Sequence, residues 1–114
     1  MAKPLKYRNK PCEDGGETYR SQRERDCHQQ LLLLQRAGQI AGLTREVSFT
    51  LAPKVKIDGE RRARPALRYV ADYVWSDIAT GRPVVADAKG LQTRVYRMKK
   101  HLMATVHGIH VVEI

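Results

Sequence analysis

Apolar residues along this chain repeat with two different periods, and each period predicts a different kind of element. Over residues 21–37 the apolar positions follow helical spacing, at Cys27, Leu31 and Leu34. Ser21 is a good N-cap for a helix, and Gly38 is a plausible stop. The pattern therefore predicts a helix over 21–37.

Strand-like patterns occupy the middle of the chain, in four stretches separated by turn residues: Arg45–Ala52, Lys54–Ile57, Leu67–Trp75 and Pro83–Lys89. In the first stretch Val47, Phe49 and Leu51 alternate with polar residues, as in a strand with one buried face. Asp58-Gly59 is a sequence typical of a hairpin turn. We therefore expect consecutive strands that are joined by short turns.

A second helix is expected over Gln92–Val106, followed by a closing strand over Ile109–Ile114. Three apolar positions of this helix should face the sheet: Val95, Met98 and Leu102. Three basic positions should face largely outward: Arg94, Arg97 and Lys100.

The order helix, three or four strands, helix, strand predicts the α/β class, with a central mixed sheet flanked by helices. Residues 1–16 carry basic residues and the Gly15-Gly16 pair, and are expected to be an arm without regular structure that ends in a turn. The length of 114 residues fits one domain, spanning 1–114.

The net charge of +9, from 21 Lys and Arg against 12 Asp and Glu, favours a polyanionic partner, with nucleic acid ahead of a membrane surface. No apolar run is long enough to cross a bilayer, so neither membrane insertion nor secretion is expected. Cys12 and Cys27 fit no zinc spacing and are interpreted as reduced thiols of a cytoplasmic protein.

Asp72 stands in the middle of an apolar strand, where aspartate is disfavoured and its lost hydration must be replaced. Alternation places it with Val70 and Val74 on one face, and Tyr69, Ala71, Tyr73 and Trp75 on the other. A metal ion, a cationic partner or a polar network would satisfy a buried carboxylate. The alternative is an aspartate that faces solvent on an edge strand.

Asp87 and Lys89 form a second charged group, because positions i and i+2 of a strand project from the same face. Phosphodiester hydrolysis uses carboxylates to hold divalent ions that polarise the phosphoryl oxygen and activate water, and an ammonium group beside them stabilises developing charge. The alternative is an ordinary surface salt bridge.

Glu24 has two interpretations. Ser21 and Glu24 have the spacing of a capping box, in which Glu24 would bond back to the Ser21 amide. Glu24 also lies on the helical face of Cys27, His28 and Leu31, which should meet the sheet and would bring the carboxylate to the site.

Three segments in this order carry a family resemblance: 16–24 at the start of the first helix, 68–73, and 87–90 followed by Thr93, Tyr96, Lys99 and Leu102. Together they resemble the phage-encoded endonucleases of Holliday-junction-resolvase type within the PD-(D/E)xK nuclease superfamily. The resemblance covers residues 7–114. It departs from the superfamily pattern at Ala71, which replaces a proline, and at Asp87, which is the shorter acid.

This resemblance implies a restriction-endonuclease-like fold, dependence on Mg²⁺ with Mn²⁺ as a substitute, and a homodimer that cuts opposing strands of branched DNA such as a four-way junction. Asp72, Asp87 and Glu24 would be metal ligands, and Lys89 would complete the catalytic set. It also implies that the protein is located in the cytoplasm of a bacterial host, if the chain is phage-encoded.

The remaining basic charge predicts phosphate contacts. The candidate DNA-binding residues are Arg8, Lys10, Arg61, Arg62, Arg64, Arg68, Thr93, Arg94, Arg97, Lys99 and Lys100. Thr93 and Tyr96 have a second interpretation, as a helix N-cap and a packing residue. Two other functions stay open, a general nicking or restriction-like nuclease and a non-catalytic nucleic-acid-binding protein.

Overall fold

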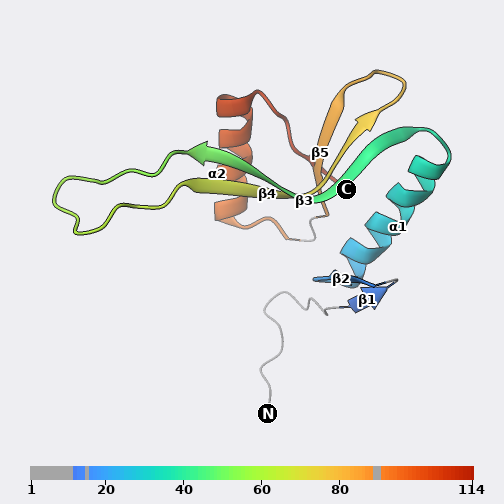
Figure 1. The fold of residues 1–114 in the computed structure, drawn as a ribbon, viewed down its shortest axis with the longest axis horizontal. Helices are drawn as coiled ribbons and strands as arrows, with labels where there is room; N and C mark the ends of the chain where they lie inside the picture. The colour runs from blue at the N-terminus through green and yellow to red at the C-terminus, as the bar shows by residue number, and fades with distance from the viewer. Residues whose placement is uncertain (1–11, 15, 89–90) are drawn as a thin grey trace, which may run out of the picture.

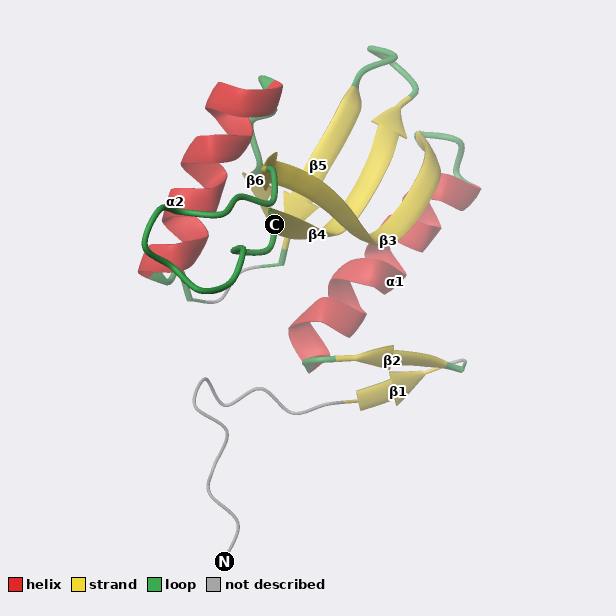
Figure 2. Ribbon diagram, turned by 60° about the vertical axis from the view of Figure 1, so that its left-hand side comes forward, coloured by secondary structure: helices red, strands yellow, loops and turns green. Residues whose placement is uncertain are grey.

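The computed structural model describes residues 12–14, 16–88 and 91–114. Its centre is a four-stranded sheet in the order β3-β4-β5-β6. The pairs β3/β4 and β4/β5 are antiparallel and β5/β6 is parallel, so the sheet is mixed. Figures 1 and 2 show one helix at each side of this sheet, which confirms the predicted α/β class.

The N-terminal part begins with a small hairpin of β1 (Cys12–Asp14) and β2 (Glu17–Tyr19), which are antiparallel. The expectation that residues 1–16 lack regular structure is therefore wrong for 12–14, because these residues pair with β2. The predicted turn is present at Gly16, where a φ of +83° suits glycine. Residues 1–11 lie outside the described part of the chain.

Helix α1 (Gln22–Arg36) begins and ends within one residue of its predicted bounds. Ser21 is the N-cap, with its Oγ accepting a hydrogen bond from the amide of Glu24 at 3.2 Å. The predicted inward face is confirmed at Leu31, which is buried, and at Cys27, which packs against the core. Leu34, at the last turn, is 38% exposed and lies outside that face.

Strands β3 (Ile40–Ala52) and β4 (Leu67–Asp77) form the long antiparallel pair of the sheet. β3 begins five residues before the predicted position, since its first half also pairs with β4 down to Asp77. Between them, residues 53–66 form a long projection, which the single bridge between Val55 and Arg64 holds together and whose turn lies at Asp58-Gly59 as expected.

The C-terminal half contains β5 (Pro83–Asp87), α2 (Arg94–Leu102), a π-helical turn η1 (Met103–His107) and β6 (Val112–Glu113). β6 is only two residues long, shorter than the strand expected over 109–114. Beyond it, the amide of Ile114 donates to the carbonyl oxygen of Asp87 at 2.9 Å, and Arg23 of α1 donates to the carbonyl oxygen of Ile114 at 2.8 Å. Residue 114 thus joins β5 to α1.

Two apolar clusters form the core. The larger one contains Tyr69 and Ala71 of β4 together with Tyr96 and Met103. The smaller one contains Leu31, Ile40 and Tyr73. The four residues that alternation predicted on one face of β4 divide between these clusters: Tyr69 and Ala71 pack with Tyr96 and Met103, whereas Tyr73 and Trp75 pack in the cluster of α1.

The predicted inward face of α2 is also wrong in part. Val95 and Met98 are 58% and 57% exposed, and Leu102 is partly buried against the larger cluster. The helix instead presents Tyr96 to the sheet, and Met103 follows two turns later on the same face. Helical geometry turns Val95 and Met98 away from that face. Within the described residues, no helix is long and apolar enough to cross a membrane.

Candidate active site

Three buried carboxylates, from α1, β4 and β5, meet where the first turn of α1 approaches the sheet. Glu24 and Asp72 are each 3% exposed, and Asp87 is fully buried. The alternative of a solvent-facing Asp72 is thus wrong, because β4 lies between β3 and β5 rather than at an edge. Asp87 is likewise not a surface charge, because it is fully buried, while its predicted neighbour Lys89 lies outside the described residues.

Asp87 is held by β4. Its Oδ1 accepts a hydrogen bond from the backbone amide of Asp72 at 2.9 Å, and its Oδ2 accepts one from the hydroxyl of Tyr69. Burial, followed by the hydrogen bond to Asp87, raises the pKa of Tyr69 far above its usual range, so this tyrosine remains a donor. The carboxylate of Asp87 is therefore fixed in orientation by groups that do not titrate near neutral pH.

Asp72 accepts from two donors on opposite sides. Its Oδ2 accepts from the amide of Ala88 at 3.0 Å, and its Oδ1 lies 2.5 Å from Nη2 of Arg20. Nε of the same arginine lies 3.4 Å from Oε2 of Glu24. One guanidinium therefore bridges Asp72 and Glu24, two of the three predicted metal ligands.

The backbone and the side chain of Glu24 have different partners, which decides between its two interpretations, a capping box and a site residue. Its backbone amide caps onto Ser21, while its carboxylate lies against arginines, with Oε1 3.1 Å from Nη2 of Arg45. Arg45 reaches from β3, stacks over the ring of Tyr19 at 4.2 Å, and also pairs with Glu17. The carboxylate of Glu24 is thus directed to the site and not to its own helix end.

The electrostatic balance of the site is unfavourable to negative charge on Asp72. Burial and then the charge of Asp87 raise the pKa of Asp72 to about 6, against the opposing hydrogen bond from Ala88 and the charge of Arg20. Burial by itself would lower the pKa of Arg20, but the charges of Asp72 and Glu24 outweigh it and raise that pKa. Positive charge close to Asp72 therefore favours its ionised form, as the contact with Arg20 does.

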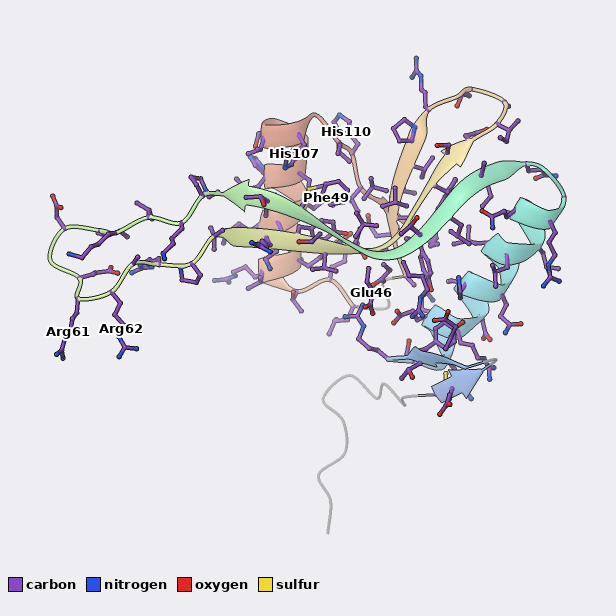
Figure 3. All side chains as sticks on the ribbon, in the orientation of Figure 1. Glu46, Phe49, Arg61, Arg62, His107 and His110 are labelled. Carbon is purple, nitrogen blue, oxygen red and sulfur yellow. The ribbon has the colours of Figure 1, made fainter. Side chains whose placement is uncertain are left out.

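Glu46 adds a feature that the sequence did not indicate. The pairs Arg45/Tyr73 and Val47/Ala71 flank it in β3, so its position is level with Asp72 in β4. Among the non-glycine residues that the structure describes, Glu46 has a positive φ, of 54°, a conformation that costs energy within a strand. Its charge contributes to the raised pKa of Arg20, and Figure 3 shows it below the crossing of β3 and β4.

Lys89, the fourth predicted catalytic residue, lies outside the described residues, as do Arg8 and Lys10. Among the side chains that are described, no group of three or more His, Cys, Asp or Glu is gathered in the form of a metal site. The side chain of Arg20 lies between Glu24 and Asp72 instead.

The other DNA-binding candidates fall into three places. Arg61, Arg62 and Arg64 lie on the projecting segment, and Arg68 is exposed on β4. On α2, Arg94 and Arg97 are exposed, Lys99 is half-buried, and Lys100 pairs with Glu113 at 2.6 Å. Thr93 is the N-cap of α2, its Oγ1 accepting from the amide of Tyr96 at 3.1 Å, and Tyr96 is buried. The capping and packing interpretations of these two residues are therefore confirmed.

Sequence reasoning missed the residues that support the acids. Arg20, Arg45, Tyr69 and Tyr73 contact the three carboxylates or, for Tyr73, the backbone carbonyl oxygen of Glu24. Only Arg20 carried a signal, because it precedes Glu24 by four residues, the spacing of a helical ion pair. The other three come from distant strands and gave no local sign.

With this geometry established, comparison with protein families gives one result. The model of a family described as protein of unknown function (DUF1064) matches residues 4–110. The chain belongs to the DUF1064 family. The match includes all three buried acids, so the site lies within the DUF1064 domain. No curated protein and no solved structure matches the chain.

Proposed function

We propose that this DUF1064 protein is a metal-dependent endodeoxyribonuclease that cuts branched DNA. The observation that carries the proposal is the bridging of Asp72 and Glu24 by a single cation, the guanidinium of Arg20, beside the buried Asp87. Three buried acids would not help a protein whose only role is to bind a polyanion. Their repulsion is costly unless a cation offsets it.

The donor set fits Mg²⁺ or Mn²⁺, because hard divalent ions prefer carboxylate oxygens. Asp72 and Glu24 would hold the ion at the position where Arg20 now contacts both, and Asp87 would be the third acid. Such an ion polarises the scissile phosphate and lowers the pKa of water. Its binding requires Arg20 to release Asp72, and the 65% exposed side chain of Arg20 has room to turn outward.

The residues around the acids have roles that follow from their contacts. Tyr69 and the amide of Asp72 hold Asp87 in place, and the amide of Ala88 holds Asp72. Once released from Asp72, the guanidinium of Arg20 would be free of that ion pair and would bind a phosphate oxygen. Lys89, which follows this segment directly, is proposed to stabilise the charge that develops on the phosphate.

A mixed sheet with an acid on each of two neighbouring strands and a glutamate on the first helix supports the restriction-endonuclease-like fold as part of this proposal. We also propose a homodimer, since two cuts on opposing strands of a junction need two sites. Light scattering tests this point, and a strict monomer on and off DNA would contradict paired cutting.

The deciding experiment compares a four-way junction with linear duplex of the same sequence, in Mg²⁺ and in EDTA. We expect paired cuts near the junction only with the metal. Asp87→Asn should abolish cutting and preserve binding, because the amide oxygen still accepts from Asp72 and the tyrosine hydroxyl can turn. Asp26→Asn, at an exposed acid of α1, is the control and should cut normally.

Cutting of linear duplex at the same rate would favour a general nicking nuclease. A folded protein that binds junctions but cuts under no divalent ion would favour a second candidate, a non-catalytic nucleic-acid-binding protein. The ion pairs of Arg20 and Arg45 are the observation in favour of that candidate, since they already offset charge on Glu24 and Asp72.

A further inference from the structure

The segment 53–66 between β3 and β4, here called the arm, leaves the body of the molecule. Figure 1 shows it extending beyond the ends of β3 and β4, away from both helices. Its hydrogen bonds run within the segment: Val55 pairs with Arg64 through backbone hydrogen bonds of 3.1 and 2.6 Å, and the backbone amide of Glu60 donates to the carbonyl oxygen of Ile57. The arm is therefore a surface element that supports no part of the core.

Charge on the arm is concentrated and mostly positive. Its ionisable residues are Lys54, Lys56, Arg61, Arg62 and Arg64, with Asp58 and Glu60 as the acids. Arg64 is paired with Glu60 at 2.7 Å. Arg61 and Arg62 are exposed near the tip, and the described ion pairs do not include them. These two arginines are available to a partner.

The arm points its free arginines toward the side of the sheet where the candidate site lies. In Figure 3 the side chains of Arg61 and Arg62 project to the same side as Glu46, whereas Phe49, His107 and His110 lie on the other side. At about 3.3 Å per residue, the path from Asp72 along β4 to Arg61 is at most roughly 36 Å. This upper limit on the separation corresponds to about one helical turn of duplex DNA.

We infer that the arm binds the phosphate backbone of duplex DNA about one helical turn from the phosphate held at the acids. This inference rests on the proposed nuclease function and adds the length of duplex that the protein reads. Arg61 and Arg62 supply the contacts. A membrane surface fits less well, because the arm contains no aromatic residue to anchor it at a lipid interface.

The test uses the full chain with Arg61→Ala and Arg62→Ala combined, and measures binding in EDTA by fluorescence anisotropy. The ligands are junctions with DNA arms of about 8 or about 20 base pairs. The short arms end before one helical turn, and the long arms extend well beyond it. The control combines Arg36→Ala and Arg82→Ala, two exposed arginines of the body, and removes the same charge.

On the long-armed junction we expect the arm variant to lose about tenfold in affinity, with a salt dependence shallower by about two phosphate contacts. On the short-armed junction it should bind as the control variant does. Equal losses on both junctions, or a loss on the long-armed junction no larger than that of the control variant, would overturn the inference. Binding to vesicles of anionic lipid is measured in parallel, and a loss on the vesicles with unchanged binding to both junctions would also overturn it.

Cleavage is measured separately, so the two proposals fail differently. If the arm variant shows the length-dependent loss while the wild type never cuts in any divalent ion, the nuclease proposal fails and the arm still binds DNA. If the wild type cuts and the arm variant cuts and binds long-armed junctions unchanged, only the inference about the arm fails.

Discussion

The backbone amide of Asp72 donates a hydrogen bond of 2.9 Å to Oδ1 of Asp87, so one acid of the site positions the other through the main chain. The amide of Ala88, next to Asp87, returns a bond of 3.0 Å to Oδ2 of Asp72. The two strands therefore lock the acids together reciprocally. A shift of β5 against β4 would disturb both carboxylates at once.

Stability in EDTA should fall as pH rises through the range in which Asp72 ionises. The pKa of Asp72 is raised to about 6, mainly by burial and by Asp87, so the folded state binds this proton more tightly than the unfolded state does. Its favourable contribution is fully present below about pH 4 and is lost as pH passes about 6. Urea unfolding at pH 4.5 and 7.5 should show a loss of about 2 kcal/mol from this group.

The contribution of Asp72 is isolated by comparing the wild type with Asp72→Asn. The variant keeps an acceptor for the amide of Ala88 and cannot ionise, so its stability should change less with pH. His28, whose pKa is lowered by burial and by Arg45, is present in both proteins and cancels. Asp26→Asn should behave as the wild type. An unchanged pH dependence in Asp72→Asn would contradict the assignment.

Arg20→Gln should make the protein more responsive to Mg²⁺. Without Arg20, Asp72 and Glu24 lose the guanidinium that bridges them, so the melting temperature in EDTA should drop by several degrees, or about 1 kcal/mol for this exposed side chain. Mg²⁺ should then raise the melting temperature more than it does in the wild type, because ligand binding to the folded state stabilises it.

The matched control for Arg20→Gln is Arg64→Gln, which removes an ion-paired arginine of similar exposure from the arm. It should leave the response to Mg²⁺ unchanged. The same rise in melting temperature in all three proteins would mean that Arg20 and a divalent ion do not compete for the acids.

Tyr69→Phe and Tyr73→Phe should separate support of the site from support of the fold. Each variant removes one buried hydroxyl, which donates to Asp87 in the first case and to the backbone carbonyl oxygen of Glu24 in the second. Both should lose about 1–2 kcal/mol of stability. Only Tyr69→Phe should reduce junction cleavage by tenfold or more, as expected for a group that orients a ligand.

Equal effects of the two tyrosine variants on the cleavage rate would show that Tyr69 acts only through stability. The measurement is single-turnover cleavage at saturating protein, which keeps binding differences out of the comparison.

Leu31→Ala should destabilise the protein by about 2–4 kcal/mol, because Leu31 is 6% exposed and packs with Ile40 and Tyr73. Leu33→Ala, on the same helix but at a 61% exposed position, should change stability by less than about 0.5 kcal/mol. Chemical denaturation compares them. Similar losses would place α1 differently on the sheet.

Local patterns predicted the elements well. Ser21 capping, the alternation of Val47 and Leu51, and the Asp58-Gly59 turn each depend on neighbours in sequence, and each is present in the structure. The predicted face of α2 was wrong in part because spacing assigned Val95 and Met98 to it, whereas Tyr96, for which packing was one of two interpretations, is the buried residue of this helix. Tertiary packing determines which face of α2 is buried, and Val95 and Met98 are exposed.

The acids of the site were identified from residue type and strand position, but their partners were not. Arg45 reaches Glu24 from 21 residues away, and Tyr69 reaches Asp87 from 18. Contacts over such separations depend on the register of β3, β4 and β5, which alternation alone leaves undetermined. Glu46 was missed for a related reason, since a positive φ inside a strand has no sequence signature at glutamate.

The hydrogen bonds of Ile114 have a consequence for the order of events during synthesis. This residue binds the backbone of Asp87 and is itself bound by Arg23, near the start of α1. A ribosome makes residues 24, 72 and 87 well before residue 114, so a nascent chain carries all three acids while the contact that joins β5 to α1 is still missing. The contact that joins β5 to α1 can therefore form only after the segments that carry the three acids have been made.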